Sequence, residues 1–305
     1  MSLFLSLLVN GLTLGGVYAL VAIGYSMVYG VLQLLNFANG DLYMVGAFVG
    51  LGVLQLAGGP GRPALPVPLL VLVMVLAAMA VSGLLGGVME KVAYRRLRNA
   101  PRIAPLISAL GVSFFLESAT LLIAGADYYS YDTSEWISNS SGISAGPLAI
   151  STTQALVIGS SVVMMYLLHL LVRRTRSGRA MRAIAVDRDA AAMMGVNVDR
   201  VILLVFVVGG AVAGAAGVVS SIVFPRDWYF MGFDTGLQAF TAAVVGGIGS
   251  VAGSALGGLL IGLASSFTAG YVSSTYSELI VFLVLIAFVL LRPRGMLGAP
   301  LQRKV

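Results

Sequence analysis

The amino-acid sequence predicts an all-α polytopic membrane protein with about eight or nine transmembrane helices. Of its 305 residues, 59% are hydrophobic and only 10% are Asp, Glu, Lys or Arg, whereas a soluble domain carries about 25% charged residues. In addition, apolar runs near the roughly 20 residues that a transmembrane helix needs recur along the whole chain. Such a chain has too little charge to cover a water-facing surface, so we expect lipid to surround it.

Nine apolar runs are candidates for membrane spans: 3–31, 41–57, 67–90, 103–124, 154–172, 201–223, 235–248, 253–270 and 277–291. The first run would be about 43 Å long as a straight helix, against a hydrocarbon core of about 30 Å. We therefore expect it to be tilted, to project from the membrane, or to be broken near Asn10-Gly11 or Gly15-Gly16. The segment 235–270 is expected either to cross twice with a bend at residues 246–249 or to be re-entrant.

The basic residues predict the orientation of these helices. Sixteen of the eighteen Lys and Arg residues lie in three clusters, at 91–102, 173–200 and 292–304, whereas the loop 125–153 holds three acids and no basic residue. By the positive-inside rule the clusters are cytoplasmic and the loop is outside. Counting backwards gives nine spans, with the amino terminus outside and the carboxyl terminus in the cytoplasm. Clusters that flank apolar runs also argue against nucleic acid as a partner.

Several classes of chemistry are excluded by residue content. The chain has no cysteine and one histidine, so we expect no metal site and no cofactor held by thiolates. A Ser-His-Asp arrangement has little to build on, and no Gly-Lys-Ser/Thr sequence is present for a P-loop. We therefore expect a non-enzymatic protein that does not bind ATP itself. No linker suggests a second domain, so residues 1–305 are expected to form one transmembrane domain.

Three features within the apolar sequence have two interpretations each. The stretch "LNFANGD", residues 35–41, predicts either a turn at Asn39-Gly40 with Asp41 capping the next helix, or polar groups near a translocation path. Glu117 lies inside a span, where a carboxylate is costly and is either paired structurally or functional. In residues 246–262, glycines spaced by four predict close helix packing or, alternatively, backbone that lines a polar path.

The stretch "AIAVDRDAAAMMGVNVDR", residues 183–200, interrupts this membrane-like chain with charge. Alanine and methionine favour a helix from about 180 to 194, Gly195 can end it, and Asn197 or Asp199 can cap the next span. The whole element, about 180–198, is expected in the cytoplasm. It is either a solvated loop or a docking helix, with a small alanine face for a partner's groove and Met193-Met194 for adaptable apolar contact.

The same stretch resembles the coupling segment of the permeases of ATP-binding-cassette (ABC) transporters. Its order of arginine cluster, "AAxMMG" and "VNVDRV" is most similar to the branched-chain amino acid permease family (LivH-type). "NGLTLGGVYALVAIGYSMVYGVLQLLNFANGD" is similar to that family's opening, "FDTGLQAFTAAVVGGIGSVAGSALGGLLIG" to its glycine-rich late segment, and "RPRGMLG" to its ending. One departure is Asn39, which stands where the family usually has a histidine.

The resemblance implies an importer subunit of the bacterial inner membrane that moves branched-chain or other apolar amino acids inward. Its partners would be a second, homologous permease, two cytoplasmic ATPases and an extracytoplasmic substrate-binding protein, besides membrane lipid. The resemblance assigns ATPase coupling to Asp187, Arg188, Asp189, Ala190, Ala191, Met194 and Gly195. It offers, as candidates for the substrate path, Asn36, Asn39, Asp41, Phe240, Thr241, Gly246, Gly247 and Gly249, and the intramembrane Glu117 joins them on physical grounds.

Three other functions stay open from the sequence. The closest is a permease of the same superfamily for urea, short amides or another small polar solute. A second is an ion-coupled secondary transporter, although such proteins typically contain inverted repeats and the sequence shows no convincing internal repeat. A third is a structural membrane scaffold, which leaves the docking helix unexplained.

Overall fold

The computed structural model describes residues 2–59, 65–98, 100–101, 103–133, 143–145 and 148–298. Within these ranges, nine long helices occur where the nine apolar runs were predicted: α1 (Ser2–Leu32), α2 (Asn39–Leu56), α3 (Val67–Met89), α4 (Ile103–Ala124), α5 (Thr152–Arg174), α8 (Val198–Val223), α9 (Met231–Gly246), α10 (Val251–Tyr271) and α11 (Ser277–Leu291). Two shorter helices, α6 (Arg176–Val186) and α7 (Arg188–Met193), join α5 to α8. Short irregular turns, η1 (Glu90–Tyr94), η2 (Arg95–Leu97) and η5 (Ser274–Tyr276), complete the helical elements.

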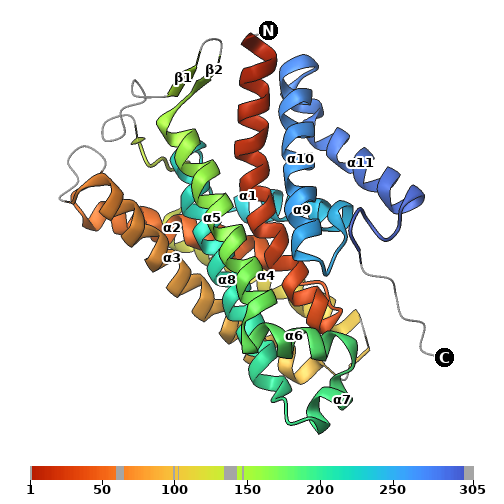
Figure 1. The fold of residues 1–305 in the computed structure, drawn as a ribbon. Helices are drawn as coiled ribbons and strands as arrows, with labels where there is room; N and C mark the ends of the chain where they lie inside the picture. Colours follow the sequence, from red (N-terminus) through yellow and green to blue (C-terminus); the bar gives the residue numbers. More distant parts are fainter. Residues whose placement is uncertain are drawn as a thin grey trace.

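Two short strands in the described residues depart from the all-helical expectation. β1 (Ile143–Ala145) pairs antiparallel with β2 (Leu148–Ile150), with Ile143 opposite Ile150. The hairpin lies at the same end of the bundle as the amino terminus, whereas α6 and α7 lie at the opposite end (Figure 1). The structure therefore separates the acidic loop predicted outside from the charged segment predicted in the cytoplasm.

Seven of the helical segments are long and apolar enough to cross a membrane, within the described residues: 3–32, 67–97, 103–124, 152–174, 198–223, 251–271 and 274–291. The remaining two long helices, α2 and α9, have 18 and 16 residues. At 1.5 Å per residue they reach about 27 and about 24 Å, short of the roughly 30 Å hydrocarbon core. The polytopic membrane architecture is thus confirmed at seven candidate spans, and α2 and α9 are the short elements.

The first helix is continuous, so of the three alternatives for this long run the break near Asn10-Gly11 or Gly15-Gly16 is excluded. α1 runs for 31 residues without interruption. Its polar and small residues are accommodated by neighbours, since the Asn10 Oδ1 accepts a hydrogen bond from Gln154 Nε2 at 2.7 Å. A Cβ atom added at Gly11 would lie 2.9 Å from the Leu263 Cα on α10. These glycines therefore serve a close helix approach rather than a bend.

The glycines of α10 let that helix pack closely on two neighbours. Gly253 and Gly257 face α9, where added Cβ atoms would collide with the carbonyls of Gly246 and Ala242. Gly258 and Gly262 face the other way, against the backbones of Ala19 and Gly15 on α1. The close-packing interpretation of the four-residue spacing is confirmed, because contacts this tight leave room only for a hydrogen at each position.

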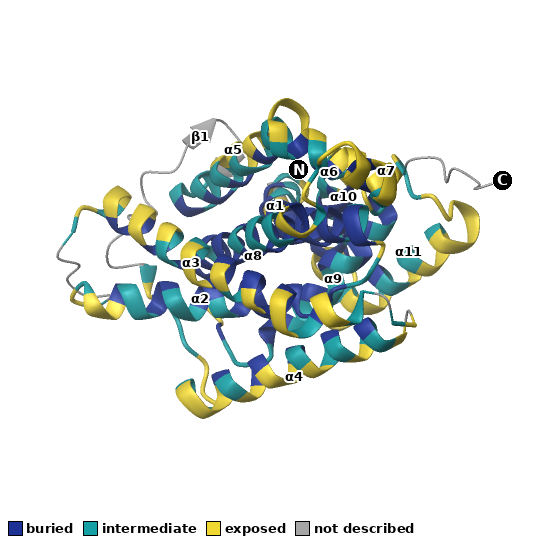
Figure 2. Cartoon of the chain, turned by 90° about the horizontal axis from the view of Figure 1, so that it is seen from below, coloured by how far each residue is buried: buried dark blue, intermediate teal, exposed yellow. Residues whose placement is uncertain are grey.

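The most buried helices are α1 and α8, which lie near the centre of the bundle in the end-on view of Figure 2. α8 packs against α1, α2 and α3, and α1 packs against α8, α9 and α10. By contrast, α4, α5 and α11 present large apolar side chains outward, among them Phe114, Phe115 and Leu122 of α4. This is the distribution expected when lipid or another membrane subunit covers the outer helices.

Candidate functional site

The charged segment between α5 and α8 folds as two helices rather than the single helix expected from 180 to 194. Asp187 adopts an extended backbone between α6 and α7, and its Oδ1 accepts hydrogen bonds from the backbone N–H groups of Asp189 and Ala190. Asp187 is therefore the residue at which α6 ends, and its side chain caps the start of α7. Gly195, at φ +84°, ends α7, and the Asn197 Oδ1 caps α8 through the Arg200 N–H. The predicted end at Gly195 and the cap at Asn197 are confirmed.

The alanine face of α7 does not point outward as one surface. Ala191 is buried against the chain itself, at 5% exposure. The exposed side of the segment consists of Asp189, Ala190, Ala192, Met193 and Met194. The expectation that Ala191 contacts a partner is therefore wrong, because its methyl group already packs inside this chain. Met193 and Met194, at 82% and 85% exposure, are large apolar side chains that the segment leaves exposed, as is Val186 at the end of α6.

Arg188 faces its own chain instead of projecting from it. Its Nη2 donates hydrogen bonds to the carbonyl oxygens of Val31, at 3.2 Å, and Leu32, at 2.9 Å. These carbonyls belong to the last turn of α1, which has no basic residue of its own there. A guanidinium at a helix carboxyl terminus satisfies free carbonyls and complements the negative end of the helix dipole. Arg188 thereby ties the amino terminus of α7 to the end of α1.

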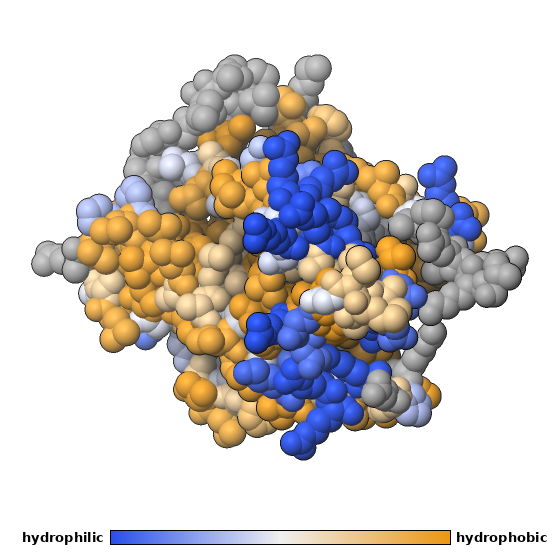
Figure 3. Space-filling model, turned by 60° about the horizontal axis from the view of Figure 1, so that its bottom comes forward, coloured by the Kyte–Doolittle hydropathy of each residue, from blue (hydrophilic) through white to orange (hydrophobic). Residues whose placement is uncertain are grey.

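A second charged link joins the α3–α4 connection to the start of α8. Arg98 pairs with Glu90, which is fully buried, and its Nη1 also contacts Asp199. Arg95 pairs with Asp199 at 2.9 Å. Asp199 is thus an ion-pair partner rather than the cap of α8. Basic residues also cover this end of the bundle, where Figure 3 shows hydrophilic side chains gathered between apolar flanks. The exposed basic residues here are Lys91, Arg95, Arg96, Arg173, Arg174, Arg176, Arg179 and Arg182.

The polar side chains of Asn36, Asn39 and Asp41, which follow α1, are buried and form hydrogen bonds to other helical elements. Asn36 accepts a hydrogen bond from the Tyr94 hydroxyl at 2.7 Å, and the Asn39 Nδ2 donates to the Val21 carbonyl at 3.3 Å. Asp41 lies inside the first turn of α2 and accepts a hydrogen bond from Ser113 of α4. It does not cap α2, so the capping expectation is wrong: α2 starts two residues earlier, at Asn39.

Asp41 and Glu117 share one buried region. The second carboxylate oxygen of Asp41 and the Oε1 of Glu117 have no hydrogen-bond partner among the described residues. Glu117 lies within electrostatic range of both Asp41 and Asp234. Buried polar atoms are normally satisfied, so oxygens like these mark a place where water or a ligand is expected.

The candidates on α9 split into an aromatic group and a tight turn. The Phe240 ring lies 5.7 Å from that of Phe37 and 6.1 Å from that of Tyr25, while the Thr241 hydroxyl donates to the Leu237 carbonyl of its own helix. Gly247 and Gly249 have φ of +107° and +94°, values that L side chains rarely adopt. Gly246 packs on Gly253, and the backbone of Gly249 lies against that of Gly30 on α1. Phe240 therefore lies beside the polar stretch, whereas the three glycines form a packed corner near the end of α1.

Residues 7–289 match the family model described as the branched-chain amino acid transport system permease component. The high-affinity branched-chain amino acid transport system permease protein LivH of Salmonella typhimurium is 40% identical over 99% of this chain and 98% of its own length. BraD of Pseudomonas aeruginosa, a permease protein of the same description, is 39% identical over the same shares.

The chain belongs to this permease family. The D-allose transport system permease protein AlsC of Escherichia coli is a more distant relative, 30% identical over 68% of the chain and 63% of its own length. The likeness to the branched-chain permeases extends over almost the whole chain, including the α6–α7 segment. The family resemblance inferred from the sequence motifs is confirmed.

Sequence reasoning missed several residues that hold this permease together. Glu90 stands beside Lys91 at the end of an apolar run, a position typical of the membrane interface, yet it is buried and paired with Arg98. Tyr94, also fully buried, donates to Asn36 and packs its ring 5.0 Å from that of Phe206. One signal was available: Glu90 is the acid beside a cluster of five basic residues. Its partner could not be read from the sequence, because Arg98 reaches it only after the chain turns through η1 and η2.

Proposed function

We propose that this permease imports branched-chain amino acids across the bacterial inner membrane, driven by ATP that partner subunits hydrolyse. The observation that carries the proposal is the similarity to LivH and BraD over nearly the full length, with an α6–α7 segment at one end of the bundle. The partners are a second homologous permease, two cytoplasmic ATPases and an extracytoplasmic substrate-binding protein. The permease itself carries out transport and no catalysis.

The proposed topology follows the distribution of basic residues. The end with α6, α7 and the exposed arginines is cytoplasmic, and the end with the β1–β2 hairpin and the amino terminus is outside. In this topology the chain forms one transmembrane domain over residues 1–305. It crosses nine times if α2 and α9 both count as short crossings. Their polar and glycine-rich first turns contact each other, since Gly40 lies against Gly232 and Gly236.

The exposed side of α7 is the proposed ATPase contact. Asp189, Ala190 and Met194 lie on this side, and Asp187 and Gly195 fix the two ends of the helix. Arg188 and Ala191 act from inside the chain. Movement of α7 would pass through Arg188 to the end of α1, and from there into the polar stretch of Asn36 to Asp41. This is a contiguous physical link between the nucleotide-driven subunit and the membrane helices.

The proposed substrate path passes the polar cluster at the centre of the bundle. Asn36, Asn39, Asp41 and Glu117 supply its polar groups, and Phe240 and Thr241 border it from α9. Gly246, Gly247 and Gly249 contribute as the corner on which α9 and α10 are joined. Because Asn39 replaces the histidine usual in the family, this position is the first to examine for differences in substrate preference.

Uptake by the complete, reconstituted transporter tests the function. With the two ATPases, the second permease and the binding protein present, we expect labelled leucine to accumulate in proteoliposomes only when ATP is inside with the ATPases. Dissipating proton and sodium gradients is expected to leave uptake unchanged. Uptake that follows an ion gradient and ignores ATP would contradict the ABC mechanism. Uptake of urea or short amides in place of leucine, isoleucine and valine would instead reassign the substrate.

A further inference from the structure

Two adjoining cavities open at the end of the bundle that carries the amino terminus. The smaller, of about 190 Å³, lies where the loop between α8 and α9 meets α1 and α2. The larger, of about 640 Å³, continues between α1, α5, α10 and the start of α11. Leu14, Tyr18 and Phe224 line both. In the proposed topology this space faces the binding protein, upstream of the polar cluster at Asn36 to Asp41.

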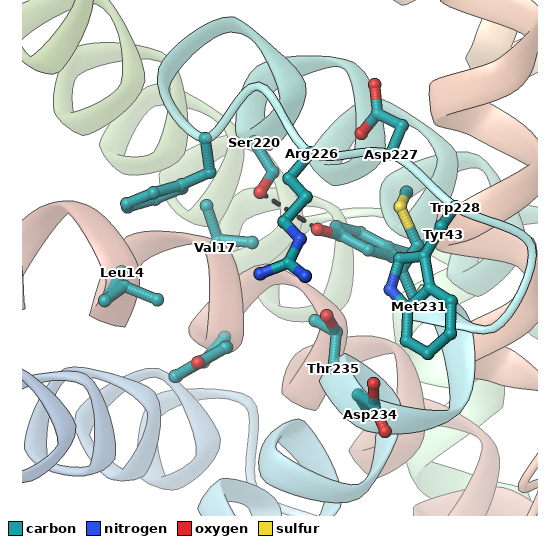
Figure 4. Close-up of a pocket in the computed structure, with 12 residues that line it drawn as sticks. Leu14, Val17, Tyr43, Ser220, Arg226, Asp227, Trp228, Met231, Asp234 and Thr235 are labelled. Carbon is teal, nitrogen blue, oxygen red and sulfur yellow. Dashed lines mark hydrogen bonds between the residues drawn. The ribbon is translucent and has the colours of Figure 1, made fainter. Parts of the chain in front are cut away.

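Arg226 brings a positive charge into the smaller cavity. The side chain extends toward Thr235 and Asp234, whereas the carboxylate of Asp227 points away from it (Figure 4). Asp227 is occupied elsewhere, since its Oδ1 accepts a hydrogen bond from Ser221 at 2.6 Å. The Arg226 guanidinium lies 4.6 Å from the centre of the Tyr128 ring, and no ion pair between described residues involves it. A cation positioned by an aromatic ring and lacking a carboxylate partner is available to an anion.

Carboxylates line the same space without pairing to Arg226. Asp234, in the first turn of α9, lines the smaller cavity, and Glu278, in the first turn of α11, lines the larger one. Neither carboxylate forms an ion pair with a described basic residue. Arg226 and Asp234 thus border one cavity without forming an ion pair with each other, so both are available to the opposite charges of one molecule.

Apolar side chains form part of the lining of the smaller cavity. Leu14 and Val17 of α1 and Met231 of α9 border the smaller cavity, together with the Trp228 ring. The rest of the wall is polar, with Tyr18, Tyr43, Ser220 and Thr235 beside the charged groups. A concave site that combines apolar side chains with convergent polar groups is typical of small-molecule recognition. The combination matches a zwitterion with a hydrocarbon side chain: an anion partner, a cation partner and an apolar surface.

We propose that this cavity is an entry site for free apolar α-amino acids, with Arg226 binding the carboxylate and Asp234 the ammonium group. Glu278 adds negative charge on the ammonium side, and the side chain of the amino acid lies against Leu14, Val17 and Met231. The site receives substrate released by the binding protein before it reaches the centre of the bundle. This inference rests on the proposed function, which supplies the amino acid as substrate.

Direct binding to the complete transporter tests the site. Labelled L-leucine is bound to the purified complex in nanodiscs without the binding protein, and unlabelled L-leucinamide and 4-methylpentanoate, which lack the carboxylate and the ammonium group respectively, are used as competitors. For the wild-type complex we expect both analogues to compete at least about tenfold more weakly than L-leucine, since each forfeits a charge-assisted contact. Arg226→Gln is expected to weaken leucine binding by about tenfold or more and to remove the preference for leucine over leucinamide. Asp234→Asn is expected to remove the preference for leucine over 4-methylpentanoate.

Two control variants and two further readouts separate this inference from other roles. Arg226→Lys is expected to retain part of the affinity, and Arg292→Gln, an exposed arginine after α11, is expected to bind leucine as the wild type does. If Arg226→Gln raises only the binding-protein concentration needed for half-maximal uptake and leaves leucine binding unchanged, Arg226 serves docking and the proposed site is wrong. If the wild-type complex shows the charge-dependent binding but imports no amino acid with ATP, the site stands and the proposed function fails.

Discussion

At the residue scale, the polar groups of this permease are defined by their partners rather than by their chemical type. Asp41 and Asp187 are both acids near the start of a helix. Asp187 caps α7 as its position suggests, whereas Asp41 reaches across to Ser113 on α4. Asp227 gives a third outcome, because it is buried in the α8–α9 loop and also pairs its backbone with that of Tyr129.

Asp227 predicts a pH dependence of stability. Burial raises the pKa of its carboxyl to about 7, although the hydrogen bond from Ser221 opposes the rise. Because the pKa of this carboxyl is higher in the folded than in the unfolded protein, its protonated form stabilises the fold. This contribution is fully present below the unfolded-state pKa of about 3.9 and is lost as pH rises through the folded-state pKa of about 7. Asp227→Asn keeps an acceptor for Ser221 and cannot ionise. We therefore expect the thermal unfolding temperature of the wild type to fall relative to the variant between pH 5 and pH 8.

The measurement is thermal unfolding of the detergent-solubilised protein across that pH range. Asp132→Asn, an exposed change in the α4–α5 connection, serves as the control for general effects of removing a carboxylate. Curves for the wild type and Asp227→Asn that stay parallel with pH would show that Asp227 does not control this dependence.

At the element scale, the α6–α7 segment is attached to the bundle through particular side chains. Gly178 packs against the carbonyls of Leu171 and Val172, Ala191 is buried, and Arg188 binds the end of α1. The segment therefore cannot shift without acting on α1. A loosely tethered loop could move without affecting α1. A segment held by such contacts can instead transmit its displacement to the membrane helices.

Arg188→Gln is expected to uncouple ATP hydrolysis from transport. The substitution removes the charge that satisfies the Val31 and Leu32 carbonyls, while the exposed face of α7 keeps its residues. Since a hydrogen bond to a charged group contributes about 1.5–3 kcal/mol, we expect the amount of leucine imported per ATP hydrolysed to fall about fivefold or more, with the complex still assembled. Uptake and ATPase rates measured on the same proteoliposomes give this ratio.

Arg200→Gln is the matched control, because Arg200 is exposed on the same side of the molecule and only its backbone takes part in a described hydrogen bond. Arg188→Lys is expected to recover part of the coupling through a single donor. An unchanged ratio in Arg188→Gln would show that the link between α7 and α1 carries no force.

At the scale of the whole molecule, the fold depends on close backbone approach at a few glycines. The α1–α10 contact joins residues about 250 positions apart in the chain, as in the Gly15–Gly262 pair. Without a hydrophobic driving force between helices in lipid, such contacts depend on van der Waals packing. The outer helices α4, α5 and α11, in contrast, leave most of their surface to lipid or to the other subunits.

Gly262→Ala is expected to destabilise the permease even though alanine favours helices by about 1 kcal/mol. The added methyl group would overlap the backbone of Gly15 and the Gly11 carbonyl, and overpacking of this kind costs about 1–3 kcal/mol or more. Gly111→Ala on α4 is the control, since its Cβ would meet no atom within 4 Å. We expect a lower thermal unfolding temperature for Gly262→Ala alone; equal temperatures for the two variants would contradict the tight α1–α10 contact.

The sequence by itself determined the membrane class, the nine helical segments and the family. Hydropathy, charge distribution and local motifs are properties of short stretches, so they can be recognised without knowing what each stretch contacts. It also correctly placed the end of the charged helical segment at Gly195 and offered Asn197, with Asp199 as the alternative, for the cap of α8. Both features depend on neighbouring residues only.

Only the tertiary structure decided which side chains of each element pack inside the chain and which stay exposed. Ala191 and Arg188 lie in the same short helix as Met193, yet they face the chain while Met193 is exposed. Arg226, Asp234 and Glu278 border adjoining cavities although they come from three separate segments. Contacts of this kind depend on how distant helices pack, and in an apolar bundle the sequence of one helix carries little information about the orientation of the next.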